Sequence, residues 1–289
     1  MPGLKEIRKR INSVKSTKQI TKAMKMVAAA KFRKAQLRIL ELKPYAEKME
    51  AVLSSLSSSV GSGHPLLEAR PVKNVEVVII TGDRGLCGAF NTNAMKMAVK
   101  TIKELEAQGY KVSVSSIGKK GVDLFKRREI TLRKSWIGLS GKISYAIAQE
   151  IAKDFTTNFI EGTFDELILV FNEFKSAAIQ RVKAFQLLPM APIRDEGKPD
   201  DTTIDFIYEP NQQAIFESLV PKNIEVQIFR ALLDSQAAEE AARMTAMENA
   251  TKAANEMISR LTLKYNKARQ ESITKELMDI VGGVEALKN

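Results

Sequence analysis

The chain has 289 residues, 44% of them hydrophobic and 27% charged, a composition typical of a globular protein of about two domains. One Cys and one His are too few for a zinc site of about four His or Cys ligands, or for a disulfide. No run of about 18 apolar residues is present, so we expect no transmembrane helix. The first residues also lack the apolar segment of a secretory signal.

Residues 4–60 carry an apolar stripe whose spacing alternates between three and four, as the seam of a coiled-coil helix requires. Lys18, Thr21 and Lys25 interrupt the stripe, and Pro44 is expected to kink or disturb the helix. A helix of this length measures about 80 Å. The stripe consists of Leu4, Ile7, Ile11, Val14, Ala28, Phe32, Ala35, Ile39, Leu42, Ala46, Met49, Leu53, Leu56 and Val60.

Gly, Ser and Pro at residues 61–65 predict a break, and we expect a linker over residues 61–72. The single histidine, His64, lies in this linker. We expect it to be exposed to solvent and not catalytic.

Residues 73–210 alternate short β-branched runs with helical patterns, which predicts an α/β layer with a mostly parallel sheet. No long helix separates the last strands, so this edge of the sheet is expected to be antiparallel. We expect strands at 75–80, 112–117, 167–171, 182–188 and 204–208, and helices at 90–105, near 121–126 and at 143–155.

Residues 211–289 predict a second coiled-coil helix, about 100 Å long, with Pro221 marking a break near its start. Its stripe slips by one residue near the C-terminal end, which locally changes a supercoil. The stripe consists of Met244, Met247, Thr251, Ala254, Ile258, Leu261, Tyr265 and Ala268, followed by Ile273, Leu277, Ile280, Val284 and Leu287.

The sequence therefore predicts an α/β protein with long helical extensions. Its parts are an N-terminal helix (1–60), a linker (61–72), an α/β domain (73–210) and a C-terminal helix (211–289). The terminal helices are expected to form an antiparallel two-helix coiled coil, with the α/β domain at one end. The C-terminal helix is the longer, so its tip should extend past the other, and its uncovered apolar stripe indicates a partner outside the chain.

The positive charge is concentrated at one end. The net charge is +11, and residues 1–50 hold 14 basic and four acidic side chains, whereas residues 211–289 hold 10 and 11. Such a segment attracts an acidic partner, which could be nucleic acid, an anionic membrane or an acidic protein surface. A solvated helix face is an equally good interpretation of the charge alone.

No motif for nucleotide binding or catalysis is complete. Two Gly-Lys pairs, Gly118-Lys119 and Gly141-Lys142, lack the earlier Gly and the following Ser or Thr of a Walker A loop. The glycines of residues 82–88 only partly resemble a dinucleotide fingerprint, and Asp83 would repel a phosphate. Cys87 has no identifiable base beside it, so it is not a convincing nucleophile.

Three stretches resemble one family. They are Leu4-Lys-Glu-Ile-Arg-Lys-Arg-Ile with Ile20 to Lys31, then Asp83-Arg-Gly-Leu-Cys-Gly-Ala-Phe-Asn91, and finally Ala242-Arg-Met-Thr-Ala-Met-Glu-Asn-Ala-Thr251 with Tyr265 to Thr274 and Ile280-Val-Gly-Gly283. Together, and in this order, they resemble the bacterial gamma subunit of the F-type ATP synthase. The resemblance spans the whole chain.

The resemblance implies a rotor shaft with a Rossmann-like central domain. In that family the terminal helices turn inside a ring of three alpha and three beta subunits, and the central domain lies near the epsilon subunit and the membrane c ring. The shaft couples proton or sodium flow through the c ring to ATP synthesis or hydrolysis. It has no catalytic site and binds no cofactor or metal, since ATP, ADP and Mg bind alpha and beta.

The family motifs imply two sets of contact residues. Those expected to contact beta and transmit torque are Met24, Lys25, Arg243, Arg269, Gln270 and Thr274. Those expected to contact the c ring or epsilon are Phe206, Tyr208 and Glu209. For Met24, plain packing between the helices is an equally good interpretation.

Two other classes of function are alternatives to the rotor shaft. A basic coiled-coil protein that binds nucleic acid also explains the charge, although its binding would fall steeply with salt. An α/β enzyme with helical arms needs a polar constellation that the sequence does not show. The resemblance implies a peripheral protein on the cytoplasmic face of a bacterial inner membrane, with no nucleic-acid partner.

Overall fold

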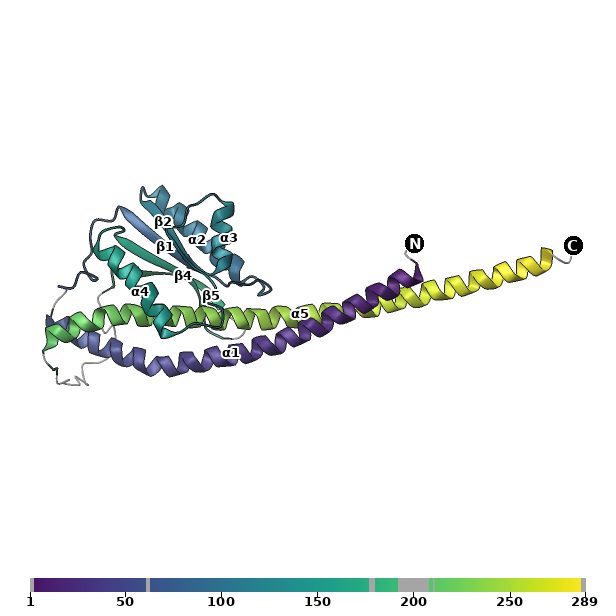
Figure 1. Ribbon diagram of the computed structural model, residues 1–289, viewed down its shortest axis with the longest axis horizontal. Coiled ribbons are helices and arrows are strands. Elements are labelled where there is room, and N and C mark those ends of the chain that lie inside the picture. Colours follow the sequence, from purple (N-terminus) through teal and green to yellow (C-terminus); the bar gives the residue numbers. More distant parts are fainter. Residues whose placement is uncertain (1–2, 61–62, 177–179, 192–207, 210, 287–289) are drawn as a thin grey trace. The chain divides into compact units, whose positions relative to one another are not determined.

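The computed structural model describes residues 3–60, 63–176, 180–191, 208–209 and 211–286. Two long helices, α1 (Leu4–Val60) and α5 (Gln212–Ala286), lie against each other, and the chain between them forms a five-stranded α/β sheet (Figure 1). This confirms the predicted fold class. By its internal contacts the chain divides into two units, residues 1–28 with 244–289, and residues 29–243.

The first unit is an antiparallel helix pair. Ile7, Ile11 and Ala28 of α1 are buried, as are Met247 and Ala254 of α5, so the predicted stripes of both helices form the seam. Thr21, one of the polar residues that interrupt the stripe, is also buried in the seam. Its hydroxyl lies 2.8 Å from that of Thr251, which fixes the antiparallel alignment at this point.

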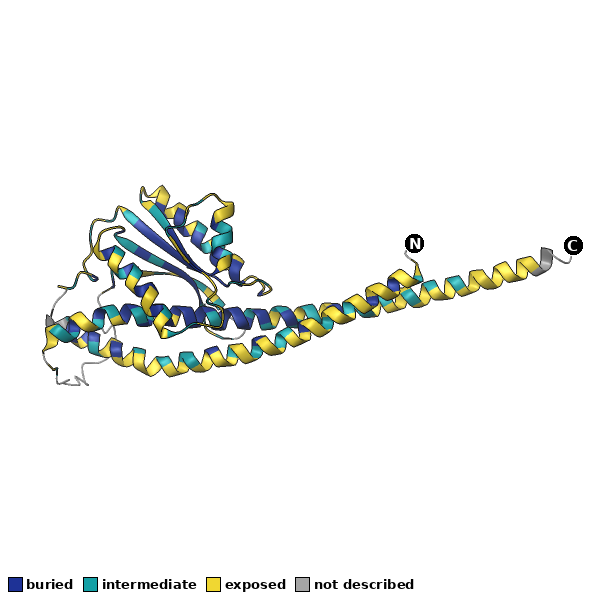
Figure 2. Ribbon diagram, viewed as in Figure 1, coloured by how far each residue is buried: buried dark blue, intermediate teal, exposed yellow. Residues whose placement is uncertain are grey.

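Helix α5 extends beyond the end of α1 within this unit. Counting from the Thr21–Thr251 pair, Leu4 lies opposite about Ala268, so about 18 residues of α5 continue past the first turn of α1. Ile273, Leu277 and Ile280, which form the shifted stripe, are 49%, 58% and 63% exposed. Figure 2 shows the change along α5 from buried to exposed residues. The predicted uncovered stripe is thus confirmed.

The second unit contains the sheet, with strand order β3-β2-β1-β4-β5. The first four strands run parallel and β5 pairs with β4 in the antiparallel direction, as predicted for this edge. The strands are β1 (Asn74–Ile80), β2 (Lys111–Ile117), β3 (Lys134–Trp136), β4 (Glu166–Phe174) and β5 (Gln180–Leu188). The short β3 was not predicted, because three residues give no apolar pattern. Of the expected strand at 204–208, only Tyr208 lies within the described residues, and it is not part of a strand.

Helices cover both faces of the sheet. One face carries α2 (Phe90–Ala107) and α3 (Lys119–Arg127), whose apolar side chains pack on β1 and β2. The other face packs against α4 (Tyr145–Ile160) and against apolar residues of both long helices, including Leu53 and Leu232. The long helices therefore complete the larger core, on this face of the sheet.

Two local expectations need correction. Helix α5 continues through Pro221 and does not break there, because Val220 and Ile224 beside it are fully buried and their packing outweighs the lost hydrogen bond. Helix α1 contains Pro44, as expected, and the kink expected there stays a prediction. His64 is half-buried and not fully exposed, with its Nδ1 accepting a hydrogen bond from the backbone N–H of Leu66 at 3.1 Å.

Candidate interaction surfaces

The residues expected at the basic part of α1 lie beside the seam. Met24 is half-buried, and Lys25 forms an ion pair with Glu248 of α5 at 3.3 Å. The side chains of this pair are 39% and 43% exposed, so water screens the attraction and each charge stays accessible to a further partner. Lys25 thus contacts α5 while part of its side chain faces solvent, and Met24 beside it is partly accessible.

The three residues expected on the C-terminal part of α5 are fully on the surface. Arg269, Gln270 and Thr274 are all exposed, in the stretch of α5 that extends past α1. They share this stretch with the exposed apolar side chains of Ile273 and Leu277. A helix with apolar, amide and cationic side chains exposed together is suited to binding another protein surface.

Arg243 has a different environment, because it is buried. It is 9% exposed and its guanidinium contacts the carboxylates of Glu239 and Glu240, the second at 2.9 Å, in the same helix. It also donates to the backbone carbonyl of Gly85 at 3.5 Å. Lys31 of α1 lies 3.9 Å from Glu240, so the cluster connects both long helices with the loop after β1.

Burial and ion pairing shift the pKa values of side chains in this cluster. Burial alone would lower the pKa of Arg243, but the carboxylates of Glu239 and Glu240 outweigh it and raise that pKa. Burial raises the pKa of Glu239 against the lowering effect of Arg243. Burial also raises the pKa of the Cys87 thiol, with a further contribution from Glu239, so Cys87 is not an activated nucleophile.

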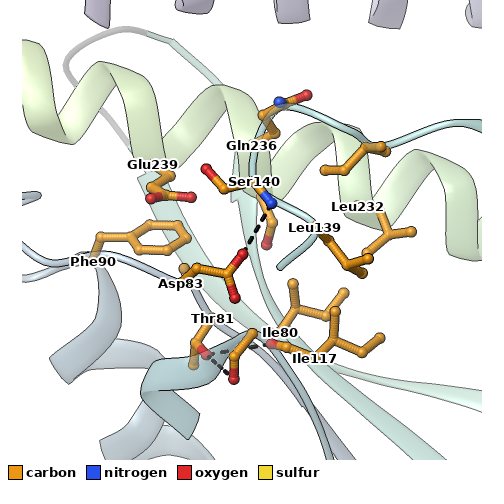
Figure 3. A pocket seen from close by; sticks show the side chains of 14 residues that line it. Ile80, Thr81, Asp83, Phe90, Ile117, Leu139, Ser140, Leu232, Gln236 and Glu239 are labelled. Carbon is orange, nitrogen blue, oxygen red and sulfur yellow. Dashed lines mark hydrogen bonds between the residues drawn. The ribbon is translucent and has the colours of Figure 1, made fainter. Parts of the chain in front are cut away.

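The loop at the carboxyl end of β1 is where α/β sheets usually bind ligands, and here the chain fills it with its own groups. The Asp83 carboxylate accepts hydrogen bonds from the backbone N–H groups of Lys119 (3.0 Å), Gly138 (3.1 Å) and Ser140 (2.9 Å). Figure 3 shows Asp83 in this pocket, with Glu239 of α5 on another side. The cavity is about 30 Å³, room for about one water molecule and not for a nucleotide.

The residues expected at the c ring are only partly described. The half-buried Tyr208 packs at the edge of the larger core, and its hydroxyl donates to Ser55 Oγ of α1 at 3.3 Å. Glu209 beside it is exposed. Phe206 lies outside the described residues.

In the described part of the chain, no group of three or more His, Cys, Asp or Glu side chains is placed to hold a metal ion. Among the described helices, none has a segment long and apolar enough to cross a bilayer.

Sequence reasoning did not find the acidic members of the Arg243 cluster. Glu239 and Glu240 lie four and three residues before Arg243, a spacing that places all three on one side of a helix. That spacing was the available signal. Their burial, and the contact of Lys31 from the other end of the chain, depend on tertiary packing and leave no local pattern.

The fold and these surfaces define a protein built on two long helices, with an α/β sheet formed by the chain between them. Comparison with known proteins agrees with that class. The family model described as ATP synthase matches residues 3–287. The ATP synthase gamma chains of Anaeromyxobacter sp. (strain Fw109-5) and Trichlorobacter lovleyi are 47% and 45% identical, each over 100% of both chains.

A solved structure is also similar. A chain in the central stalk and c-ring structure of the Tetrahymena thermophila mitochondrial ATP synthase is 28% identical, with a TM-score of 0.59, covering 80% of this chain and 99% of that one. The chain therefore belongs to the gamma chains of F-type ATP synthases, the non-catalytic subunits of the central rotor. This assignment selects the shaft interpretation over the nucleic-acid and enzyme alternatives.

Proposed function

We propose that this chain is the shaft that turns inside a ring of three alpha and three beta subunits and couples ion flow through a c ring to ATP synthesis or hydrolysis. The observation that carries the proposal is the stretch of α5 beyond α1. Its apolar residues, 49% to 63% exposed at Ile273, Leu277 and Ile280, require a cover from another protein.

Contacts with beta are proposed at two levels of the helix pair. Met24 and Lys25 form the first, where the ion pair with Glu248 leaves the Lys25 ammonium accessible to an acidic loop. Arg269, Gln270 and Thr274 form the second, where all three side chains are exposed. Arg243 is proposed to take part in torque transmission to beta as well. Because its side chain is buried, we propose that it contributes indirectly.

The charge of α1 suits a shaft that turns. Its basic side chains are mostly exposed and spread along the helix, so an acidic sleeve would attract the shaft without selecting one rotational position. Many similar contacts that exchange during rotation transmit torque without a deep energy minimum. Neutralising one lysine should therefore change coupling little, and neutralising several should weaken it.

The foot of the shaft is proposed to contact the c ring and epsilon through Phe206, Tyr208 and Glu209. The hydrogen bond from Tyr208 to Ser55 attaches this segment to α1 and leaves Glu209 exposed. ATP, ADP and Mg are proposed to bind alpha and beta and not this chain, in agreement with the cavity filled by Asp83. The bacterial relatives support a location on the cytoplasmic face of the inner membrane, through the complex.

The proposal is tested by measuring Mg-ATP hydrolysis of the matching alpha and beta subunits with and without this chain. We expect the chain to assemble with them and raise the rate severalfold, and the double variant Arg269→Ala, Gln270→Ala to lose most of that gain. Arg260→Ala is the matched control, since Arg260 is a 79% exposed arginine of the same helix outside the proposed contacts. Equal rates with and without the chain would overturn the proposal.

A further inference from the structure

A buried ionic cluster lies at the point where the sheet meets the long helices in residues 29–243. We define the joint as Lys31, Gly85, Glu239, Glu240 and Arg243. The side chains of Glu239, Glu240 and Arg243 are only 9%, 4% and 11% exposed. Ionised side chains this deep are rare and costly unless paired, so their arrangement calls for a specific role.

Arg243 is the centre of the joint. Its two terminal nitrogens contact Glu239, Glu240 and the carbonyl of Gly85, and Glu240 in turn faces Lys31 of α1 at 3.9 Å. One guanidinium therefore joins α5 to the loop after β1 and, through Glu240, to α1. Its planar set of donors can hold several acceptors at fixed angles, which a lysine cannot do.

The loop held by Arg243 is itself stiffly built. We call residues 82–91 the β1 loop; this segment follows the central strand β1 and includes the first two residues of α2. Within it, Gly82 N–H donates to Asn91 Oδ1 at 2.9 Å, and Asn91 Nδ2 donates to the carbonyl of Arg84 at 3.3 Å. Leu86 has a φ of 62° although it is not glycine, a conformation that persists only where surrounding contacts hold it.

Apolar contacts support the same attachment. Cys87 and Phe90 of the β1 loop are buried against Ala238 of α5. Phe174 at the end of β4 packs on this cluster and meets Phe32 of α1 edge to face, with ring centroids 5.3 Å apart. Apolar surfaces allow small sliding, whereas buried ion pairs resist separation because separating them leaves buried charges without a partner.

We propose that Arg243 is a positioning residue of the rotor, which locks the β1 loop to both long helices so that torque passes between the helix pair and the α/β sheet with little twist. It acts through its contacts with Gly85, Glu239 and Glu240. This inference rests on the proposed function, because torque is transmitted only in a shaft that turns.

The test measures rotational stiffness in the assembled complex. A bead is attached to Glu106→Cys on the exposed side of α2, the alpha–beta ring is fixed to a surface, and rotation is stalled with a non-hydrolysable ATP analogue. Cys87 is 2% exposed, so labelling is directed to the introduced cysteine. The width of the bead's angular fluctuations then reports the stiffness between α2 and the fixed ring.

We expect Arg243→Ala to raise the angular variance at least twofold. Arg243→Lys, which keeps the charge but cannot hold all three acceptors, should give an intermediate value. Arg260→Ala is the matched control, because it removes an arginine paired with Glu256 at the same four-residue spacing on the exposed surface, and it should leave the variance unchanged. An unchanged variance in assembled Arg243→Ala complexes would overturn the proposal.

A second variant tests the proposal in case the Arg243→Ala protein fails to fold. The triple change Glu239→Gln, Glu240→Gln, Arg243→Met removes all the buried charges while keeping volume, and such replacements commonly preserve stability. It should also raise the variance at least twofold, and a wild-type value would refute the joint. Absence of ATP-driven rotation in the wild-type complex would instead count against the proposed function, so the two failures are distinguishable.

Discussion

The Asp83 side chain lies in the pocket at the end of β1 and accepts three backbone hydrogen bonds there. Asp83→Ala therefore tests how much these hydrogen bonds stabilise the domain. The Asp83 carboxylate accepts from Lys119, Gly138 and Ser140 at 3.0, 3.1 and 2.9 Å, so one side chain holds the start of α3 and the loop after β3. Each N–H left without an acceptor costs about 1 kcal/mol or more. Since Asp83 is half-exposed and water can replace part of the loss, we expect a total of about 2–3 kcal/mol.

Urea unfolding of the isolated chain measures this loss. Trp136, the single tryptophan, is buried at 7% exposure in β3 and its fluorescence reports the packing of the sheet. Asp123→Ala is the matched control, because Asp123 is also an aspartate of this domain but only pairs with Lys120 at 3.8 Å on the surface. That control should change the free energy of unfolding by less than about 0.5 kcal/mol.

A small carboxylate should partly restore the Asp83→Ala protein. The vacated position presents three N–H donors, so acetate can take the place of the lost side chain. At 100 mM acetate with a Kd of about 10 mM, the gain would be about 1.4 kcal/mol. Equal stabilisation of wild type by acetate, or a loss below about 1 kcal/mol in the variant, would refute the reasoning, with sodium chloride at the same ionic strength as the reference.

Three further changes have expected outcomes. Arg133→Ala should destabilise the chain by about 3–5 kcal/mol in urea unfolding, because Arg133 lies 3.1 Å from the fully buried Glu76 carboxylate; a loss below about 1 kcal/mol would contradict this. Burial raises the pKa of Asp234 to about 6, so this carboxylate favours folding below its unfolded pKa near 4 and opposes it once ionised above about 6. Asp234→Asn should therefore gain stability at pH 8, by up to about 3 kcal/mol, and none near pH 4; an equal gain at both pH values would refute the assignment. The double variant Leu277→Ser, Ile280→Ser should leave unfolding of the isolated chain unchanged within about 0.5 kcal/mol, since both side chains are exposed. The same variant should weaken assembly with alpha and beta in a pull-down, and unweakened assembly would contradict the proposed cover.

The sequence predicted the features that repeat along the chain. The three–four spacing identified both long helices and the seam, including the register at which Thr21 falls on it. The β-branched runs identified four of the strands and the antiparallel edge. These succeed because local periodicity reflects which face of an element is buried.

Features that depend on tertiary packing were missed or incorrectly predicted. Pro221 appears to local rules as a break, but neighbouring buried residues hold the helix together. The contact of Arg243 with beta stays a prediction, but its burial in a cluster with residues 31, 85, 239 and 240 depends on tertiary packing that no motif reveals. The loop around Asp83 was predicted to be a structural turn, but the three N–H partners of Asp83 come from distant segments and could not be predicted.

Rotation of this chain in an assembled complex is the most direct test of its role as a shaft. The ring of alpha and beta subunits is fixed to a surface, a bead is attached to Glu106→Cys on α2, and Mg-ATP is added. The account predicts stepwise rotation in one direction, which stops when ATP is exhausted. A complex that contains the chain and hydrolyses ATP while the bead shows no directed rotation would contradict the account.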